Sequence, residues 1–381
     1  MAQQDPDITA AIQSSGELTL EGAAAKAKEE YDKLMHVTLD IAVTGESGAG
    51  KSSFVNAIRG LSDDDDDGAA PTGVTETTKE PTMYLHPTMP NIRVWDLPGI
   101  GTQNFKAKQY IKDVNFNTYD FFIIISSERF KENDIMLAKE IKKNKKKFYF
   151  VRSKIDNDIC TEMRKAGFNE QNVLLKIRED CKKNLVDFKD CKVFLISSLE
   201  INKYDFQLLE DTLEKDLPAT KRYALIKAWP VCSKEVFKRK VEAFQKSIWA
   251  LAFLSAGVAV APVPGMSAAF DASVVMGFFA SCYRAFGLDD ASLERLSKRT
   301  GKDLKPLRKS KFVSALKNDV SLPVRISALA LVEYISSLIP GVGSAAAAGI
   351  SFGTTKWILN KGLNEIIDTA REIMKEAGLE C

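Results

Sequence analysis

Histidine is almost absent from the sequence, and cysteine is sparse. His36 and His86 are the only histidines, and none of the six cysteines belongs to a CxxC pair. These features argue against a zinc site of cysteine and histidine ligands, and they exclude a dense disulfide framework. We therefore expect a protein of the reduced, cytosolic compartment.

An excess of charge of one sign is missing as well. The chain carries 53 lysines and arginines against 51 aspartates and glutamates, which leaves a net charge of +2. This balance gives no reason to expect a nucleic-acid partner. Hydrophobic residues make up 45% of the 381 residues and charged residues 27%, an ordinary globular composition in a chain long enough for two or three domains.

No targeting segment is recognisable in the sequence. The first ten residues, MAQQDPDITA, have neither the basic nor the apolar part of a signal peptide. Residue 2 is alanine, whereas N-myristoylation needs glycine, and the final EAGLEC is not a CaaX box. We expect a cytoplasmic protein, and these features give no support for a lipid anchor.

Short apolar runs alternate with helix-like stretches over the first half of the chain. The runs predict strands at 37–43, 92–95, 121–126, 148–151 and 193–196, and the stretches predict helices at 52–59, 134–143 and 173–184. Such alternation indicates an α/β domain with a mostly parallel sheet covered on both faces. The aspartate run 63–67 predicts a loop that lies in water.

The two ends of the chain predict an all-α domain. Residues 19–36 have a helical pattern, and after residue 217 the strand signals stop, leaving long helices separated by proline and glycine. We divide the chain into an N-terminal helical segment 1–36, an α/β domain 37–217 and a C-terminal helical domain 218–381. The two helical parts are expected to form one domain.

Residues 45–52 match the phosphate-loop pattern G-x-x-x-x-G-K-[ST] at every fixed position, directly after a predicted strand and before a predicted helix. Glycines let successive backbone N–H groups turn toward phosphates, and the helix N-terminus adds its positive end. Lys51 is expected to reach the β- and γ-phosphates, and the Ser52 hydroxyl to ligate Mg²⁺. The predicted phosphate-binding residues are Gly45, Glu46, Ser47, Gly48, Ala49, Gly50, Lys51, Ser52 and Ser53.

A second motif, WDLPG at 95–99, ends the next predicted strand. Asp96 is expected to hold Mg²⁺ through water, and the Gly99 N–H to sense the γ-phosphate. Taken alone, the motif is typical of a turn at a strand end. Beside the phosphate loop it indicates a nucleotide-hydrolysing site.

A third motif indicates which base is bound. Ser153, Lys154 and Asp156 resemble the guanine-reading [NT]KxD motif of GTPases, with serine where asparagine or threonine is usual. A carboxylate here accepts hydrogen bonds from both N–H groups of guanine, whereas adenine would leave it unpaired. The sequence therefore favours GTP over ATP. Ser197 and Ser198, after the last predicted strand, are a looser match to the loop that closes over the base.

The threonine-rich loop 72–79 is a candidate switch. Thr75, Thr77 and Thr78 could each bind Mg²⁺ and order the loop around the γ-phosphate. Residues 96–101 contain no glutamine of the kind that positions the attacking water in many small GTPases. Intrinsic hydrolysis is therefore expected to be slow, or another residue must position the water.

Longer blocks of sequence resemble the immunity-related, interferon-inducible GTPases of vertebrates. The blocks are GESGAGKSSFVNAIRG, TGVTETTKE, VWDLPGIGTQNF, YDFFIIISSERFKENDIMLAKEI, FYFVRSKIDNDI and YDFQLLEDTLEKDLP, in that order. The resemblance covers residues 20–250 well and the rest in outline. It implies a Ras-like P-loop domain inserted in a helical domain made from both chain ends, and GTP-dependent self-assembly on pathogen vacuoles and other intracellular membranes, with related GTPases as possible partners.

The same resemblance implies roles for particular residues. Glu76 stands where the family's switch glutamate is implicated in hydrolysis, and Thr78 matches the Mg²⁺ threonine. Arg129 matches an arginine that members present across a dimer of GTPase domains, although an exposed loop arginine explains it equally well. The lysine at 51 resembles the effector-like branch of the family, which has lysine rather than methionine there.

Two stretches, 247–270 and 334–355, contain no charged residue. Their lengths would suit membrane spans. However, prolines 262 and 264 interrupt the first, and the second is rich in alanine, glycine and serine after Pro340. A helical core and a membrane-lying element both remain open. The six lysines in 139–147 similarly fit either a solvated face or a contact with acidic lipid or a partner.

Two functions follow as alternatives. The leading one is a Mg²⁺-dependent GTPase that self-assembles as a homodimer or oligomer and acts at membranes in innate immunity. The other is a scaffold that binds GTP or GDP with negligible hydrolysis, because no glutamine is in place. An ATPase is disfavoured by Asp156, and a translation-type GTPase by the lack of a basic domain.

Overall fold

The computed structural model describes residues 29, 33, 36–65, 68–73, 78–100, 106–188, 191–231, 233–258, 266–304, 313, 316 and 352–379. The chain divides into two compact units. Residues 38–217 form the first, here called the sheet unit. Residues 1–37 and 218–381 form the second, the helical unit.

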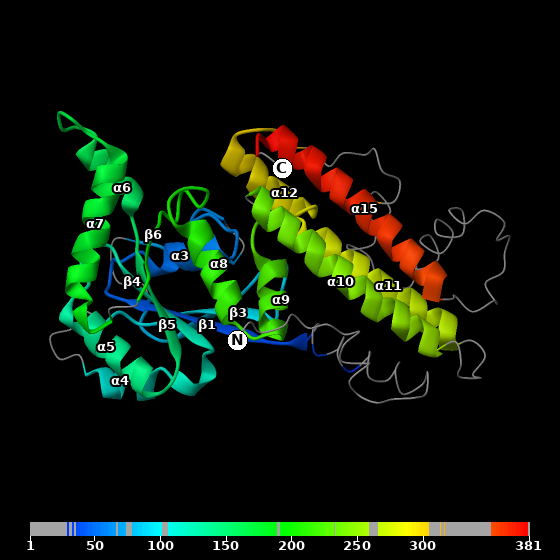
Figure 1. The fold of residues 1–381 in the computed structure, drawn as a ribbon, viewed down its shortest axis with the longest axis horizontal. Helices are drawn as coiled ribbons and strands as arrows, with labels where there is room; N and C mark the ends of the chain where they lie inside the picture. Colours follow the sequence, from blue (N-terminus) through cyan, green and yellow to red (C-terminus); the bar gives the residue numbers. More distant parts are fainter. Residues whose placement is uncertain are drawn as a thin grey trace. The chain divides into compact units, whose positions relative to one another are not determined.

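A six-stranded sheet in the order β2-β3-β1-β4-β5-β6 organises the sheet unit (Figure 1). Every pairing is parallel except that between β2 and β3, which is antiparallel. The strands are β1 (Leu39–Gly45), β2 (Thr82–Leu85), β3 (Ile92–Asp96), β4 (Phe121–Ser126), β5 (Lys147–Arg152) and β6 (Val193–Leu195). The α/β fold with a mostly parallel sheet is therefore confirmed.

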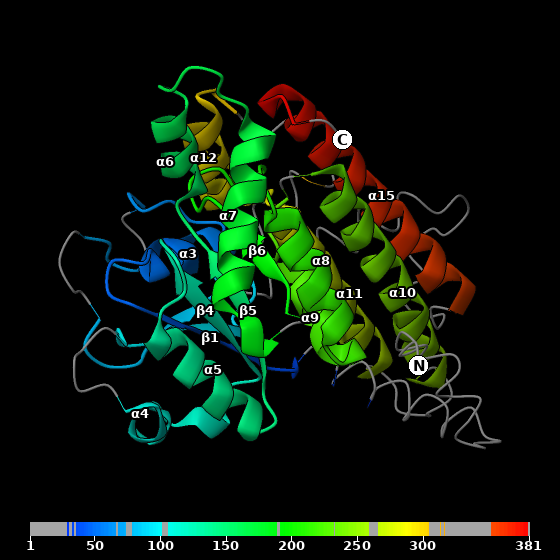
Figure 2. The same cartoon turned by 60° about the vertical axis from the view of Figure 1, so that its left-hand side comes forward.

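Helices cover both faces of this sheet (Figure 2). They are α3 (Lys51–Ile58), α4 (Ala107–Asp113), α5 (Glu132–Lys143), α6 (Ile155–Glu162), α7 (Glu170–Asn184) and α8 (Phe206–Asp216), with 3₁₀ turns at Phe116–Thr118 and Val186–Phe188. All residues of the central strands β1 and β4 are buried, because they face helices on both sides. Because β1, β3 and β5 are parallel, their carboxyl ends lie on the same side of the sheet. The phosphate loop, the WDLPG motif and the base-reading motif follow these three ends.

Several predicted boundaries need correction. The strand predicted at 37–43 begins at Leu39 and runs to Gly45, because the Val37 N–H donates to the Lys33 carbonyl in a helical bond. The edge strand β2 was not predicted, since its four residues are mostly exposed and lack an apolar run. Only positions 29, 33 and 36 of the helix predicted at 19–36 are described, and they are helical; the others lie outside the described residues.

The aspartate run is not simply a loop in water. Asp63 is half-buried and accepts hydrogen bonds from the Ser53 hydroxyl (2.7 Å) and the Asn56 amide (2.9 Å). The fully buried Asn56 side chain also pairs with the N–H and the carbonyl of Ala70. These bonds fix the ends of the acidic loop against α3.

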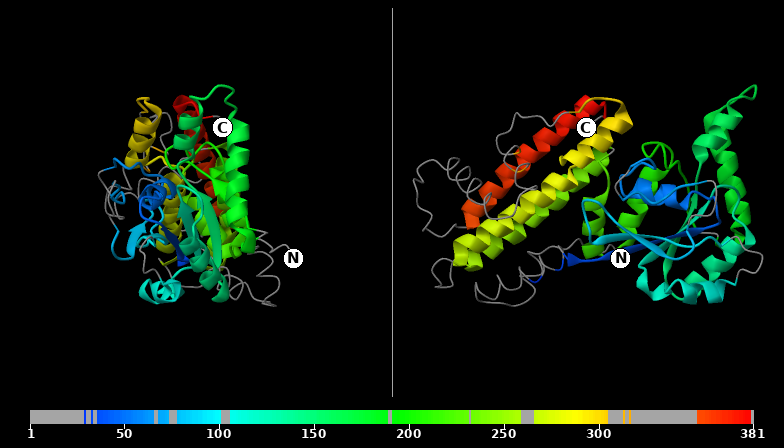
Figure 3. Two further views of the ribbon diagram at one scale, coloured as in Figure 1. Left: turned by 90° about the vertical axis from the view of Figure 1, so that its left-hand side faces the viewer. Right: turned by 180° about the vertical axis from the view of Figure 1, so that it is seen from behind.

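The described residues of the helical unit form α9 (Ala219–Ala228), α10 (Lys234–Val258), α11 (Met266–Ala285), α12 (Asp290–Thr300) and α15 (Phe352–Ala377). The long helices α10, α11 and α15 lie side by side (Figure 3). Phe244 of α10 packs between Phe278 of α11 and Phe286, which directly follows α11. In the part of the chain that the structure describes, no helix combines the length and apolarity that crossing a membrane requires.

Candidate nucleotide site

The phosphate loop joins β1 to α3, and its glycines are sterically required. A Cβ on Gly45 would lie 2.0 Å from the Ile125 carbonyl oxygen, so no other residue fits between β1 and β4. Gly48 and Gly50 have φ of 77° and 89°, a left-handed conformation that glycine adopts without strain. Gly50 thereby starts α3 at Lys51, which points the helix N-terminus at the loop.

Lys51 is held inside this loop. Its side chain is buried, and its ammonium donates to the carbonyls of Gly45 (3.3 Å) and Glu46 (3.0 Å). Ser47 and Gly48 are exposed at the tip of the loop, while Ala49 is buried. The lysine charge therefore lies among the backbone groups that are expected to surround the phosphates.

Three oxygen-bearing side chains meet beside Lys51. The Ser52 hydroxyl donates to Asp96 Oδ2 at 2.6 Å, and the Thr78 hydroxyl donates to the same atom at 2.9 Å. Asp96 Oδ1 is buried and has no hydrogen-bond partner among the described residues. Oxygen ligands of this kind are the ones Mg²⁺ prefers, so the residues present fit that cation.

Burial raises the pKa of Asp96 above its ordinary value, while the hydroxyls of Ser52 and Thr78 and the charge of Lys51 oppose the shift. A divalent cation at this position would favour the ionised carboxylate. The three residues predicted to hold metal are thus brought together.

The loop after β3 is tied to the phosphate loop. The Ile100 N–H donates to the Gly45 carbonyl at 3.2 Å, and the Leu97 N–H to the Val43 carbonyl at 2.9 Å. The Asn133 amide donates to the Ile100 carbonyl at 2.8 Å, which adds a connection to α5. Gly99, between these anchors, is half-buried near the loop whose phosphate it is expected to sense.

Ser153 links the base-reading motif to the phosphate loop. Its buried hydroxyl donates to the Ala49 carbonyl at 2.6 Å, and its N–H donates to the Ser126 carbonyl at 2.9 Å. Lys154 has a φ of 57°, and its Cε would lie 3.7 Å from a Cβ on Gly50, so its stem runs over the phosphate loop. Asp156 is half-buried in the first turn of α6.

The loop after β6 meets the base-reading motif through one backbone bond, from the Ile155 N–H to the Ile196 carbonyl at 3.2 Å. The Ser197 hydroxyl accepts hydrogen bonds from the N–H groups of Leu199 and Glu200, both at 3.2 Å. Its side chain is therefore used to shape the loop, whereas Ser198 is half-buried. The Ser53 hydroxyl likewise donates to Asp63. If Ser53 contacts a phosphate, its backbone N–H is the group that does so.

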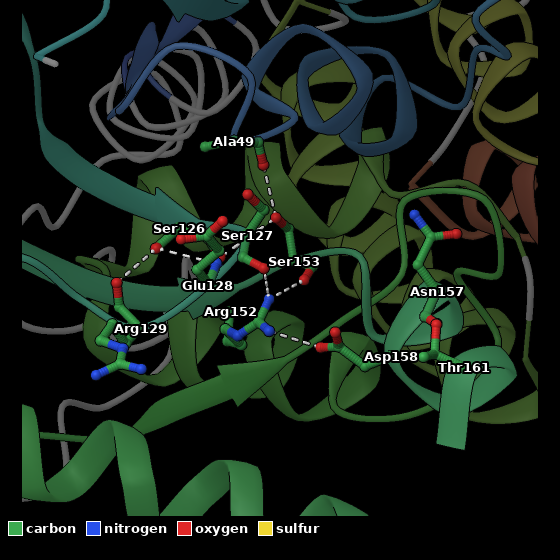
Figure 4. A network of polar contacts seen from close by, with 10 residues as sticks. All are labelled: Ala49, Ser126, Ser127, Glu128, Arg129, Arg152, Ser153, Asn157, Asp158 and Thr161. Carbon is green, nitrogen blue, oxygen red and sulfur yellow. Dashed lines mark hydrogen bonds and ion pairs between the residues drawn. The ribbon is translucent and has the colours of Figure 1, made fainter. Parts of the chain in front are cut away.

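Sequence reasoning gave no role to Arg152, which lies at the centre of a polar network (Figure 4). Its guanidinium donates to the Ser127 carbonyl, to the Ser153 carbonyl (2.8 Å) and to the Asp158 carboxylate (2.6 Å). It thereby joins the loop after β4 to the base-reading motif. The sequence feature that could have pointed to Arg152 is its position directly before Ser153, the first residue of the base-reading motif.

A second unforeseen contact joins Glu46 to Lys131. The ammonium of Lys131 lies 2.6 Å from Glu46 Oε2 and 3.7 Å from Glu128 Oε2. The partner carboxylate of Glu46 raises the pKa of Lys131. Because both side chains are partly exposed, the pair contributes little to stability, but it connects the phosphate loop to the loop before α5.

The structure does not test the catalytic roles predicted for Glu76 and Arg129. Glu76, with Thr75 and Thr77, lies outside the described residues. Arg129 is exposed, and in the described part of the chain its guanidinium makes no hydrogen bond or ion pair; only its carbonyl is engaged, by the Ser126 hydroxyl at 3.2 Å. Both roles stay predictions.

Comparisons with known proteins agree with the resemblance found in the sequence. A model of the interferon-inducible GTPase family matches residues 6–377. The chain is 38% identical to interferon-inducible GTPase 5 of Rattus norvegicus, over 99% of this chain and 83% of that protein. It is 40% identical to interferon-gamma-inducible GTPase 10 of Mus musculus, over 89% of this chain and 81% of that protein.

Solved structures are more distant. Toc33 from Arabidopsis thaliana in complex with GDP and Mg²⁺ is 16% identical, with a TM-score of 0.32, over 46% of this chain and 78% of that chain. This similarity is too weak to bear on function.

Proposed function

The chain belongs to the interferon-inducible GTPase family and is a GTPase, and we propose that it hydrolyses GTP with Mg²⁺ at the site around Lys51. The observation that carries the proposal is the convergence of the Ser52 and Thr78 hydroxyls on Asp96. These are the three residues selected from the sequence as metal ligands, and they come from three separate segments of the chain.

Each residue has a distinct task in this proposal. The backbone N–H groups of 45–53 and the Lys51 ammonium bind the phosphates, and Asp156 accepts the two N–H groups of guanine. Ser52, Thr78 and Asp96 would hold Mg²⁺, which supplies charge neutralisation at the phosphate oxygens. Ser153 acts indirectly, because its bond to the Ala49 carbonyl keeps the base-reading and phosphate-binding loops in register.

Hydrolysis is proposed to depend on self-assembly into dimers or larger oligomers. The segment after Asp96 lacks a glutamine, so another group must position the attacking water, and Glu76 is the candidate. The exposed Arg129 guanidinium is available to a second GTPase domain. An arginine supplied in this way stabilises the charge that develops on the phosphates.

The proposed setting is the cytoplasm, with peripheral attachment to endomembranes or pathogen vacuoles, in innate immunity. The charge-free stretches 247–270 and 334–355 and the family resemblance support attachment. Related GTPases are possible partners, and nucleic acid is not expected.

Turnover across a protein dilution series tests this proposal. The GTPase rate per molecule should rise with protein concentration in the wild type, because assembly completes the site, and should be abolished by Lys51→Ala at all concentrations. A flat rate close to zero, with nucleotide binding intact, would instead favour the nucleotide-gated scaffold.

The base specificity has its own test. Asp156→Asn should shift preference from GTP toward xanthosine triphosphate, because xanthine presents an acceptor where guanine presents a donor. Competition binding with the two nucleotides measures the shift. Unchanged GTP selectivity in this variant would refute the assignment of Asp156.

A further inference from the structure

Three segments of the sheet unit meet at the guanidinium of Arg152 (Figure 4). Its Nη1 donates to the carbonyl of Ser127 and, at 2.8 Å, to the carbonyl of Ser153. Its Nη2 donates to the Asp158 carboxylate at 2.6 Å. Ser127 begins the segment 127–131 between β4 and α5, here called the β4–α5 loop. Arg152 therefore connects this loop directly to the motif that is expected to bind guanine.

The connection is buried and charged. Arg152 ends β5 and lies beside Ser126, the last residue of β4, in the parallel register. Its side chain is buried, so its charge depends on these fixed acceptors and not on water. Burial raises the pKa of Asp158, the charge of Arg152 opposes this shift, and the charge of Asp156 adds to it. Moving either segment would break a hydrogen bond of a buried charge, so we expect the two to move together.

The β4–α5 loop has further fixed points along its length. The Ser126 hydroxyl donates to the Arg129 carbonyl at 3.2 Å and accepts the Glu128 N–H at 3.3 Å. At the end of the loop, the Lys131 ammonium lies 2.6 Å from the Glu46 carboxylate in the phosphate loop. The β4–α5 loop is thus tied to the base-reading motif at its start and to the phosphate loop at its end.

Arg129, at the middle of this loop, has a fixed backbone and an open side chain. Its guanidinium is exposed and makes no hydrogen bond or ion pair with the described residues. Figure 4 shows this side chain directed away from the network around Arg152. The reach of the Arg129 guanidinium is therefore set by the position of the loop, and a displacement of about 1 Å at a reacting group can lower a rate about a hundredfold.

We propose that Arg152 is a positioning residue that couples guanine binding to the β4–α5 loop. Guanine bound at Asp156 orders residues 153–158, and Arg152 passes this order to Ser127. The loop then holds Arg129 where it acts on hydrolysis. This inference rests on the GTPase site proposed above and adds that the base affects the rate of hydrolysis as well as the affinity.

Hydrogen exchange of the full-length protein tests the coupling without turnover. Saturating GDP should slow amide exchange in both 153–158 and 127–131 of the wild type. In Arg152→Lys the slowing in 127–131 should be lost, because a lysine ammonium lacks the planar fork that reaches Ser127 and Asp158 together. The slowing in 153–158 should persist, since Asp156 is unchanged.

A matched control and a second variant accompany this measurement. Arg178 donates in the same way to the Val193 carbonyl at 2.9 Å and to the Asp205 carboxylate at 2.7 Å. Arg178→Lys should therefore keep both responses to GDP. If Arg152→Lys does not fold, Asp158→Asn takes its place: it removes the charge that holds the guanidinium to α6 and should weaken the response in 127–131.

Turnover provides a readout that a purely structural role would not change. Inosine triphosphate lacks the 2-amino group of GTP, so Asp156 accepts only one of its two hydrogen bonds. At saturating nucleotide the wild type should hydrolyse GTP about tenfold faster than inosine triphosphate, and this ratio should fall to about one in Arg152→Lys. GDP affinity should change by less than about threefold in the variant. Adding Arg152→Lys to Arg129→Ala should lower GTP turnover no further, because both residues act through one loop.

The outcomes separate this inference from the proposal beneath it. If the wild type neither binds nor hydrolyses GTP, the proposed site fails and the coupling fails with it. If the wild type is active but Arg152→Lys keeps the GDP response of 127–131 and the ratio of GTP to inosine triphosphate turnover, only the coupling fails. Equal losses in Arg178→Lys would assign the effect to lowered stability and would also overturn the inference. Hydrogen exchange decides the same question if turnover is too slow to measure.

Discussion

Ser153 replaces the asparagine or threonine that is usual at the start of the guanine-reading motif, and its hydroxyl retains a structural task. Ser153→Ala would leave the buried Ala49 carbonyl without its 2.6 Å donor. An unmet buried acceptor costs about 1–3 kcal/mol. We expect the free energy of unfolding of the sheet unit to fall by about 1 kcal/mol or more, and the dissociation rate of fluorescent GDP to rise.

Ser153→Thr is the matched control, because threonine keeps the hydroxyl at the same position. Urea unfolding and stopped-flow nucleotide release should place it much closer to the wild type than the alanine variant. Equal release rates in all three proteins would show that the bond to Ala49 does not hold the two loops together.

Asp134 is an acidic residue in the first turn of α5, and its burial predicts a pH dependence of the stability of this helix. The carboxylate is fully buried, accepts the Lys131 N–H at 2.9 Å, and leaves Oδ1 without a partner among the described residues. Burial raises the pKa of Asp134 to about 7 from 3.8. A raised pKa means that the folded state holds the proton more tightly than the unfolded state.

The stabilisation from Asp134 is therefore fully present below pH 3.8 and is lost as the pH rises through about 7. Asp134→Asn keeps the hydrogen-bond acceptor and removes the titration. The difference in unfolding free energy between variant and wild type should grow with pH over this window, by on the order of 1 kcal/mol per unit at most. Glu132→Gln, an exposed acid in the same turn, should produce a much smaller trend in the same urea titrations.

Elements were predictable from sequence where burial is uniform. The strand at 121–126 was predicted with the bounds that β4 has, because both of its faces are covered and its residues are all apolar until the last. The edge strand β2 was missed, since its pairing with β3 comes from tertiary structure and its sequence, TMYL, is too short to show a pattern.

In the candidate site, too, some residues could be predicted from the sequence and others could not. Lys51, Ser52 and Asp96 follow from the spacing that phosphate and Mg²⁺ require, so a motif was enough to find them. The contacts that fix the loops, Arg152 to Ser127 and Lys131 to Glu46, join segments from 25 to 85 residues apart. No local pattern encodes such pairs, and they became visible only when the sheet brought the loops to one edge.

For the whole molecule, the two units should respond differently to pH and to ligand. Lys227 in the helical unit is 4% exposed, and burial lowers its pKa to about 8 from 10.5. Its ammonium lies 4.5 Å from the centroid of the Tyr223 ring, which offers partial compensation. Because the folded pKa is the lower one, the unfolded state binds the proton more tightly, so this lysine's contribution to stability is present above pH 10.5 and is lost as the pH falls through about 8.

Lys227→Met should therefore stabilise the helical unit at pH 7 by on the order of 2 kcal/mol, and the gain should shrink steadily as the pH is raised from 8 to 10. Lys238→Met, an exposed lysine on α10, should show neither the gain nor the trend. Differential scanning calorimetry with and without GDP and Mg²⁺ assigns the transitions, because nucleotide stabilises only the unit that binds it. A Lys227→Met shift confined to the nucleotide-sensitive transition, or one independent of pH, would contradict a charge buried in the helical unit.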